Sequence, residues 1–251
     1  MEENSSEDKL MRTTIEAFGA GVGTWIGLFL GPPGVVAGSI AGVYLARGLN
    51  EMASRVLSKR EQARVGLVIS FMASELQARI QNGEQVRQDG FFDNVEGRSS
   101  AEELLEGVFI KCKNEYEEKK IRYISKVYTT VAFDSTITPA TANQILNNAQ
   151  QLSYRQLTIL ACIGQNNEYQ LSIGENKLKN FDTSLQSVLL DFIGLISLML
   201  LNRQFPDPIY EIEAVVGSTM TLSPIGAQHF KLLNLHLMPP EEFHFLHDVN
   251  E

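Results

Sequence analysis

The stretch FGAGVGTWIGLFLGPPGVVAGSIAGVYLARG, residues 18–48, decides how the N-terminal part of this chain folds. It contains nine glycines and no charged residue before Arg47. Three interpretations are open for such a stretch: a phosphate-binding loop, a flexible linker, or a pair of helices suited to lipid.

The first two interpretations lack the residues that they require. A phosphate loop needs a lysine close to its glycines, and this chain has none between Lys9 and Lys59. A dinucleotide fingerprint follows a buried strand, whereas the residues before Gly19, TTIEAF, do not have the pattern of one. A glycine and serine linker is polar, but here large apolar residues such as Trp25 and Phe29 lie between the glycines.

The glycine spacing favours helices that pack closely. On a helix, residues four apart form a stripe along one face. Stripes of small residues let helix backbones approach each other in lipid, where the hydrophobic effect does not drive association. Such packing offsets the roughly 1 kcal/mol that each glycine costs a helix. The stripes recur every four residues on both sides of a double proline and comprise Gly19, Gly23, Gly27, Gly31, Gly34, Gly38 and Gly42.

The ends of this segment predict a helical hairpin. Thr13 to Glu16 has the pattern of a capping box, and Pro32-Pro33 separates the two arms. Arms over residues 14–31 and 33–47 would be roughly 27 and 22 Å long. A bilayer core is about 30 Å thick, so the arms would cross thinned lipid, insert partly, or span when assembled. A glycine-rich hairpin buried inside a soluble oligomer is the alternative.

Basic residues follow the hairpin directly. They are Arg47, Arg55, Lys59 and Arg60. Basic residues this close to a membrane segment favour the cytoplasmic side. An even number of crossings then places both termini in the cytoplasm. We call these four residues the basic collar.

The remainder of the chain has helical periodicity, so we predict a mostly all-α fold. The predicted parts are an acidic tail (1–12), the hairpin (13–48), a juxtamembrane helix (49–82), a loop (83–98), a helical domain (99–165) and a C-terminal part (166–251). Helix starts are indicated at Ser100 to Glu103, Thr138-Pro139, Ser153 to Gln156 and Ser223 to Gly226.

Two stretches of this remainder invite further interpretation. The apolar run 185–201 is predicted to be a buried core helix rather than a third membrane segment, because Asp191 within it would be costly in lipid. The charged run EYEEKK, 115–120, indicates a solvated face or a helix junction. Cys112 and Cys162 have no metal-like neighbours and are predicted to be buried, reduced thiols.

Three phrases carry a resemblance to known proteins. LSYRQLTILACIG (152–164), SLQSVLLDFIGLISLML (184–200) and TLSPIGAQHFKLL (221–233) resemble a winged-helix arrangement. Their order also resembles the C-terminal half of bacterial abortive-infection alpha-type proteins. That resemblance implies a phage-defence or cell-suicide role at the bacterial inner membrane, and it carries no catalytic residues across.

These observations predict a membrane-active effector. Its hairpin would assemble with copies of itself in the bilayer under the control of a cytoplasmic helical domain that binds a sensor or regulatory protein. No catalytic constellation, cofactor or metal site is expected, and the net charge of −9 argues against nucleic acid as a partner. The alternatives are an anchored or oligomeric adaptor, which could be cytoplasmic, and a soluble winged-helix regulator. The regulator is disfavoured because residues 185–201 contain no lysine or arginine.

Overall fold

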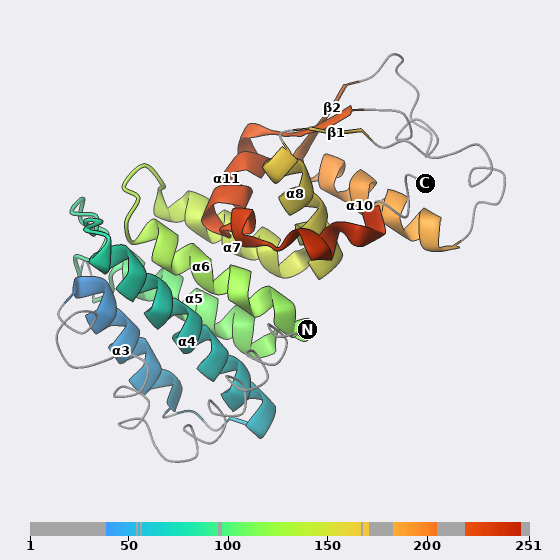
Figure 1. Cartoon of the computed structure of the whole chain (residues 1–251). Helices are drawn as coiled ribbons and strands as arrows, with labels where there is room; N and C mark the ends of the chain where they lie inside the picture. Colours follow the sequence, from blue (N-terminus) through green and yellow to red (C-terminus); the bar gives the residue numbers. More distant parts are fainter. Residues whose placement is uncertain are drawn as a thin grey trace. The chain divides into compact units, whose positions relative to one another are not determined.

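A computed structural model gives the fold of the chain. It describes residues 39–53, 55, 57–94, 97–166, 168–170, 183–204 and 219–246. These residues are mostly helical, which confirms the predicted all-α class at that level. The chain divides into two compact units, residues 1–150 and 151–251, and each is described by itself (Figure 1).

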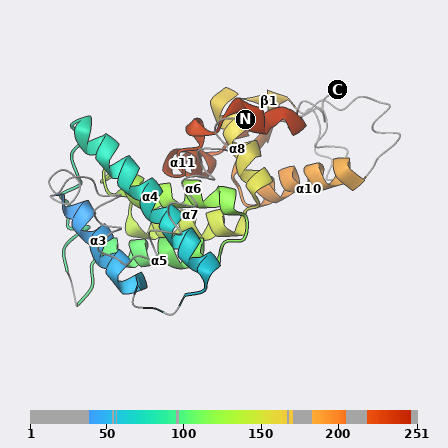
Figure 2. The same ribbon diagram turned by 60° about the horizontal axis from the view of Figure 1, so that its bottom comes forward.

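The first unit is a bundle of helices. Its helices are α3 (Ile40–Ala53), α4 (Lys59–Gln81), α5 (Ser100–Asn114), α6 (Ile121–Val131) and α7 (Pro139–Gln151), with a 3-10 turn, η1 (Glu118–Lys120), between α5 and α6. Helix α4 packs on α5 and α6, and α3 packs on α5 and α4 (Figures 1 and 2). Apolar side chains from all of these helices form the core. Among the described helices, none is both long enough and apolar enough to cross a bilayer.

The juxtamembrane helix expected over 49–82 is two helices in the structure. The chain leaves α3 after Ala53, and α4 begins with a capping box in which Ser58 Oγ accepts from the Glu61 amide. The Glu61 carboxylate accepts in return from the Ser58 amide at 2.8 Å. In a continuous helix these two amides would donate to carbonyls of the preceding turn. Because they donate to the capping side chains instead, a new helix begins at Lys59. Asn82-Gly83 ends α4, with Gly83 at φ 79°.

Helix α5 begins one residue earlier than the sequence indicated. The capping box uses Ser99 with Glu102, not Ser100 with Glu103. Two serines precede two glutamates here, so both registers have the same pattern. The structure selects the register that buries Ser99 and leaves Glu103 to accept from the Asn143 side chain of α7 at 2.8 Å.

The predicted loop at 83–98 lies inside the first unit and is fixed by Arg87. This arginine is buried and donates to the backbone carbonyls of Val131 and Ile137, at 3.3 and 2.9 Å. Its guanidinium also lies 4.5 Å from the centroid of the Phe91 ring. Charge-assisted bonds to carbonyls make Arg87 the anchor that holds the loop against the end of α6.

The charged run 115–120, predicted to be either a solvated face or a helix junction, is the junction between α5 and α6. Lys120 and Glu115 are nevertheless almost fully buried, and Lys120 Nζ lies 2.7 Å from Glu115 Oε2. Lys120 Nζ also donates to the Gln150 carbonyl near the end of α7, at 2.9 Å. The junction therefore joins three helices through a buried ion pair.

The second unit combines helices with a small antiparallel sheet. Its elements are α8 (Tyr154–Asn166), β1 (Tyr169–Gln170), α10 (Thr183–Ser197), β2 (Leu201–Gln204), β3 (Thr219–Leu222), α11 (Pro224–Leu232), η3 (Leu235–Leu237) and η4 (Pro240–Phe243). The strand order is β1-β3-β2, with Met220 opposite Tyr169 on one side and Arg203 on the other. Helix α8, expected in a 99–165 domain, instead packs on α10, α11 and β3 of this unit.

Two glycines of the second unit allow close approach, Gly226 to a backbone carbonyl and Gly164 to an aromatic ring. A Cβ at Gly226 of α11 would lie 2.0 Å from the Leu200 carbonyl oxygen. A Cβ at Gly164 of α8 would lie 2.3 Å from the Phe230 ring. Ser223 caps α11, as predicted, and its amide donates to the same Leu200 carbonyl at 3.0 Å. The start of α11 is thus fastened to the chain segment that enters β2.

Helix α10 contributes to the core, as the prediction of a buried core helix over 185–201 expects, but it ends at Ser197 and is buried on one face only. One face is in the core, and Asp191 is held by Arg155 of α8 in an ion pair. The opposite side exposes Leu190, and the exposed residues Leu198 and Met199 follow the end of the helix at Ser197. Met199 has φ 56° and its amide donates to the Ile196 carbonyl, a left-handed helix stop.

Both cysteines, Cys112 and Cys162, are free and buried, as predicted.

We expect His229 of α11 to make the second unit sensitive to acid. Burial lowers the pKa of this imidazole below its ordinary value of 6.5, although the hydrogen bond to the Ile225 carbonyl acts in the opposite direction. The unfolded chain therefore takes up the proton first, and stability falls by about 1.4 kcal/mol per pH unit below about pH 6.5, until the folded pKa is reached. Denaturant unfolding of the unit at about pH 7.5 and pH 5.5 measures this loss.

The matched substitutions are His229→Gln and His236→Gln, since His236 is exposed on the turn that follows α11. The acid-dependent loss should shrink in His229→Gln and persist in His236→Gln. Equal acid sensitivity of the two variants would contradict a role for His229.

Candidate functional site

The structure describes one end of the predicted hairpin. Gly19, Gly23, Gly27, Gly31, Gly34 and Gly38 lie outside the described residues, as do all of residues 1–38. Gly42 lies in α3 and is buried, and its amide donates to Ser39 Oγ at 3.1 Å. The last part of the predicted second arm is therefore helical, and α3 continues beyond Arg47 to Ala53. Lipid contact of this arm stays a prediction.

Helix α3 packs on the first unit through an apolar seam. Ala41, Leu45 and Met52 are almost fully buried and, with Gly48, follow helical spacing along one face. A Cβ at Gly48 would lie 2.9 Å from side-chain atoms of both Leu105 and Phe109 of α5. Gly48 is outside the predicted glycine series, yet it is the glycine at which α3 meets α5 most closely among the described residues.

Two tyrosines fix α3 to other parts of the unit. The Tyr44 hydroxyl donates to the Phe92 carbonyl at 2.5 Å, and the Tyr128 hydroxyl of α6 donates to the Ala41 carbonyl at 3.3 Å. Burial, with smaller effects from neighbouring groups, raises the pKa of Tyr128 far above its ordinary value, so this hydroxyl remains a donor. Both bonds are buried and hold the N-terminal half of α3 in the unit.

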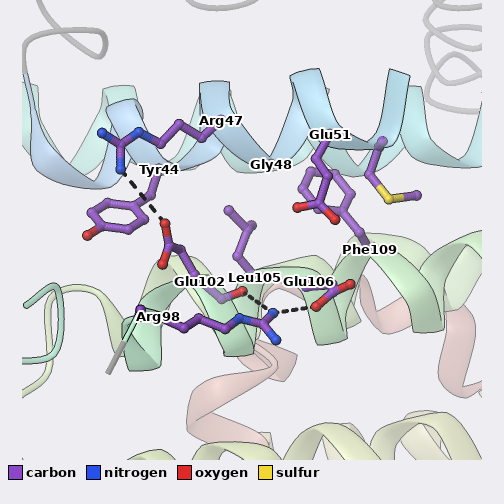
Figure 3. A pocket seen from close by; sticks show the side chains of 11 residues that line it. Tyr44, Arg47, Gly48, Glu51, Arg98, Glu102, Leu105, Glu106 and Phe109 are labelled. Atoms are coloured by element: carbon purple, nitrogen blue, oxygen red, sulfur yellow. Dashed lines mark hydrogen bonds and ion pairs between the residues drawn. The ribbon is translucent and has the colours of Figure 1, made fainter. Parts of the chain in front are cut away.

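Three of the four collar residues form ion pairs with glutamates. Arg47 lies 3.8 Å from Glu102, and Arg55 Nη2 lies 2.9 Å from Glu106 (Figure 3 shows the first pair). Arg60 lies 2.7 Å from Glu118 of η1. Lys59 is exposed at the start of α4. The helical unit therefore supplies carboxylate partners to three residues that the sequence analysis interpreted as the basic collar of a membrane segment.

Glu106 connects one collar residue, Arg55, to an arginine outside the collar, Arg98. It pairs with Arg55, which also contacts Glu51 at 2.6 Å, and with Arg98 from the loop before α5. The hydrogen bonds from Arg55 and then Arg98 lower the pKa of Glu106, in spite of partial burial. We call this group the arginine–glutamate cluster; its members are Arg47, Arg55, Arg98, Glu51, Glu102 and Glu106.

A cavity of about 370 Å³ lies between α3 and α5 beside the cluster (Figure 3). Tyr44, Gly48 and Met52 line it from α3, and Leu105 and Phe109 line it from α5. Its rim carries the charged side chains Arg47, Glu51, Arg98, Glu102 and Glu106. A polar rim over an apolar floor marks α3 and α5 as an interface that is incompletely packed.

The charged side chains of the site are arginines and glutamates that pair with one another. Within the part of the chain that the structure describes, no group of three histidine, cysteine or acidic side chains could hold a metal ion. Comparisons of the chain with protein-family models, curated proteins and solved structures find no match.

Sequence reasoning indicated Arg47 and Arg55 of this site but missed Arg98 and the glutamates of α5 that pair with these arginines. Glu102 was expected only as part of a helix start, and Glu106, Arg98 and Tyr44 were not singled out. The spacing of Glu102 and Glu106, four residues apart on α5, is the signal in the sequence that could have indicated an acidic face opposite the collar.

Proposed function

We propose that this protein is a membrane-active effector in which α3 couples a glycine-rich hairpin, residues 13–48, to the helical unit. The observation that carries the proposal is the position of α3. This helix continues the uncharged glycine-rich segment, and it is also packed and ion-paired on α5. A change in the helical unit can therefore act on the hairpin directly. In this proposal the helical unit holds the hairpin inactive until a signal releases α3.

A winged-helix-like second unit is part of the proposal. The order α8–β1–α10–β2–β3 and the sheet order β1-β3-β2 support it, because a winged helix has this topology of helices and antiparallel strands. Helix α10 would be the recognition helix, and it exposes Leu190 but carries no lysine or arginine. A protein partner therefore fits this face better than a nucleic acid.

The proposed setting is phage defence at the bacterial inner membrane, with both termini in the cytoplasm. The resemblance to abortive-infection alpha-type proteins, which covers about residues 100–235, supports it. Activation would cluster several chains, and hairpin arms slightly shorter than the bilayer favour association because mismatch is relieved between copies. An anchored or oligomeric adaptor without membrane-disrupting activity is the second candidate, favoured by the exposed apolar residues Leu198 and Met199 in the turn after α10.

Dye release from vesicles separates these two functions. We expect the full-length protein to release dye, and a variant with Gly23→Leu, Gly27→Leu and Gly38→Leu to release it at least about tenfold more slowly, because about 1.4 kcal/mol of lost helix packing is a factor of ten. The matched control carries Val22→Leu, Val35→Leu and Val36→Leu, which add apolar bulk in the same segment but leave the glycines in place.

Release at the same rate by both variants would remove the glycine-packing mechanism. Membrane binding by the full-length protein without any dye release would favour the adaptor. Retention in the membrane fraction after a carbonate wash of cells reports insertion independently of either outcome.

A further inference from the structure

The arginines of the collar are engaged with carboxylates although their side chains are accessible. The Arg47 side chain is 65% exposed and that of Arg55 is 38% exposed. Their partners Glu102 and Glu106 are less exposed, at 29% and 27%. The guanidinium groups therefore lie at the edge of the α3–α5 interface, where a ligand from solution can reach them.

A phosphate group can replace a carboxylate at such a site. The planar guanidinium presents paired N–H donors that match the oxygens of either group in the same bidentate geometry. An arginine that donates its hydrogen bonds to Glu106 cannot donate the same hydrogen bonds to a phosphate. Because exposed pairs of this kind contribute little individually, replacement needs no large driving force.

The outer face of α3 has the pattern of a helix that lies at a bilayer surface. Ile40 and Val43 are 46% and 40% exposed, and Arg47 follows one turn later on the same side. Two apolar side chains beside the cation of Arg47 suit the boundary between acyl chains and anionic headgroups, and Glu51 lies one turn further along the same face. The opposite face of α3 is the apolar seam on α5, so the two faces of this helix serve different surroundings.

We propose that the carboxylates of the arginine–glutamate cluster are an intramolecular substitute for anionic lipid headgroups, and that an anionic bilayer surface competes with them for Arg47 and Arg55. The cluster thereby holds α3 on α5 and sets a threshold for membrane engagement. This inference rests on the proposed membrane function, and it adds the lipid class and the residues that regulate binding. Glu106 is the central residue because it pairs with both Arg55 and Arg98.

Glu106→Gln tests the inference, with Glu103→Gln as its matched control. Both changes remove one negative charge from α5, but Glu103 accepts from Asn143 and not from an arginine of the cluster. The assay is sedimentation of the full-length protein with vesicles of phosphatidylglycerol and phosphatidylcholine. We expect Glu106→Gln to bind about three- to tenfold more tightly than the original protein, the range for one or two exposed charge pairs, and Glu103→Gln to bind nearly as the original does. Vesicles of phosphatidylcholine alone should not distinguish the variants.

Two further measurements connect any gain to α3. Adding Arg55→Gln to Glu106→Gln should reverse the tighter binding, because the freed guanidinium is then absent. Amide hydrogen exchange without vesicles should be faster across α3 in Glu106→Gln than in Glu103→Gln, which also checks that the rest of the bundle stays folded.

Equal binding of Glu106→Gln and Glu103→Gln to anionic vesicles would overturn the inference, as would an equal gain on phosphatidylcholine alone. Its failure is distinguishable from failure of the proposed function. Tighter anionic binding by Glu106→Gln without dye release by any form of the chain would support the cluster and reject membrane disruption. Dye release by the protein, together with equal binding of the two glutamate variants to anionic vesicles, would support membrane disruption and reject the role of the cluster.

Discussion

Gly226→Ala should destabilise the second unit by about 3 kcal/mol or more, because a methyl group at this position overlaps backbone that cannot rotate away. The added Cβ would lie 2.0 Å from the Leu200 carbonyl oxygen. That carbonyl already accepts from the Ser223 amide, so relief requires α11 to move away from the entry to β2. For a unit of about this size the melting temperature should fall by roughly 10–20 °C. Thermal unfolding, with hydrogen exchange in β2, β3 and α11, measures the effect.

Gly194→Ala is the matched control for this substitution. Gly194 also lies in a helix of the second unit, but its added Cβ would meet only Gln156 Nε2, at 3.1 Å. The end of a flexible side chain can move, and alanine is favoured over glycine in a helix by up to about 1 kcal/mol. Gly194→Ala should therefore be neutral or stabilising. A Gly226→Ala protein as stable as the original would contradict the close approach of α11 to Leu200.

Lys120→Met should destabilise the first unit by about 3–5 kcal/mol, since it leaves the carboxylate of Glu115 buried without its cation. Both side chains are 2% exposed, and the pair is direct at 2.7 Å. The substitution also removes the donor to the Gln150 carbonyl, which holds the end of α7. Denaturant unfolding at neutral pH, with hydrogen exchange in α5, α6 and α7, reports the loss.

The double variant Lys120→Met/Glu115→Gln separates the buried charge from the lost contacts. A glutamine can still accept from the Glu117 amide, as Glu115 does at 3.0 Å, but it carries no charge. The double variant should therefore recover a large part of the stability lost in Lys120→Met. If the double variant is less stable than Lys120→Met alone, the cost does not come from an unpaired carboxylate.

Local signals in the sequence predicted where several helices begin. Ser153 and Ser223 were identified as caps, and both hold the amide three residues later. The same kind of signal at Ser58 was overlooked because the apolar periodicity continues on both sides of it. At Ser99 two overlapping registers had the same pattern, and the choice depends on which serine is buried. Capping depends only on residues that are close in the sequence. A prediction from the sequence is therefore either correct or wrong by a residue or a turn.

Partners distant in the sequence could not be predicted in the same way. Periodicity indicates which face of α3 is apolar, but not that Tyr128 donates to Ala41 from 87 residues away. The run 115–120 has the composition of a solvated surface, yet Lys120 is buried because α7 covers it with the Gln150 carbonyl. Charge in the sequence indicates the collar arginines, whereas their pairing with glutamates of α5 and η1 depends on the tertiary fold.

The connection between α3 and α4 limits how far α3 can travel. Five residues separate Ala53 from Lys59, and a segment of this length spans at most about 20 Å when fully extended. A displaced α3 would therefore stay near α5 at an effective concentration on the order of millimolar. Return to α5 would be an intramolecular step whose rate is independent of how much protein a cell contains. Each molecule could thus reset by itself, without a second factor to reload it.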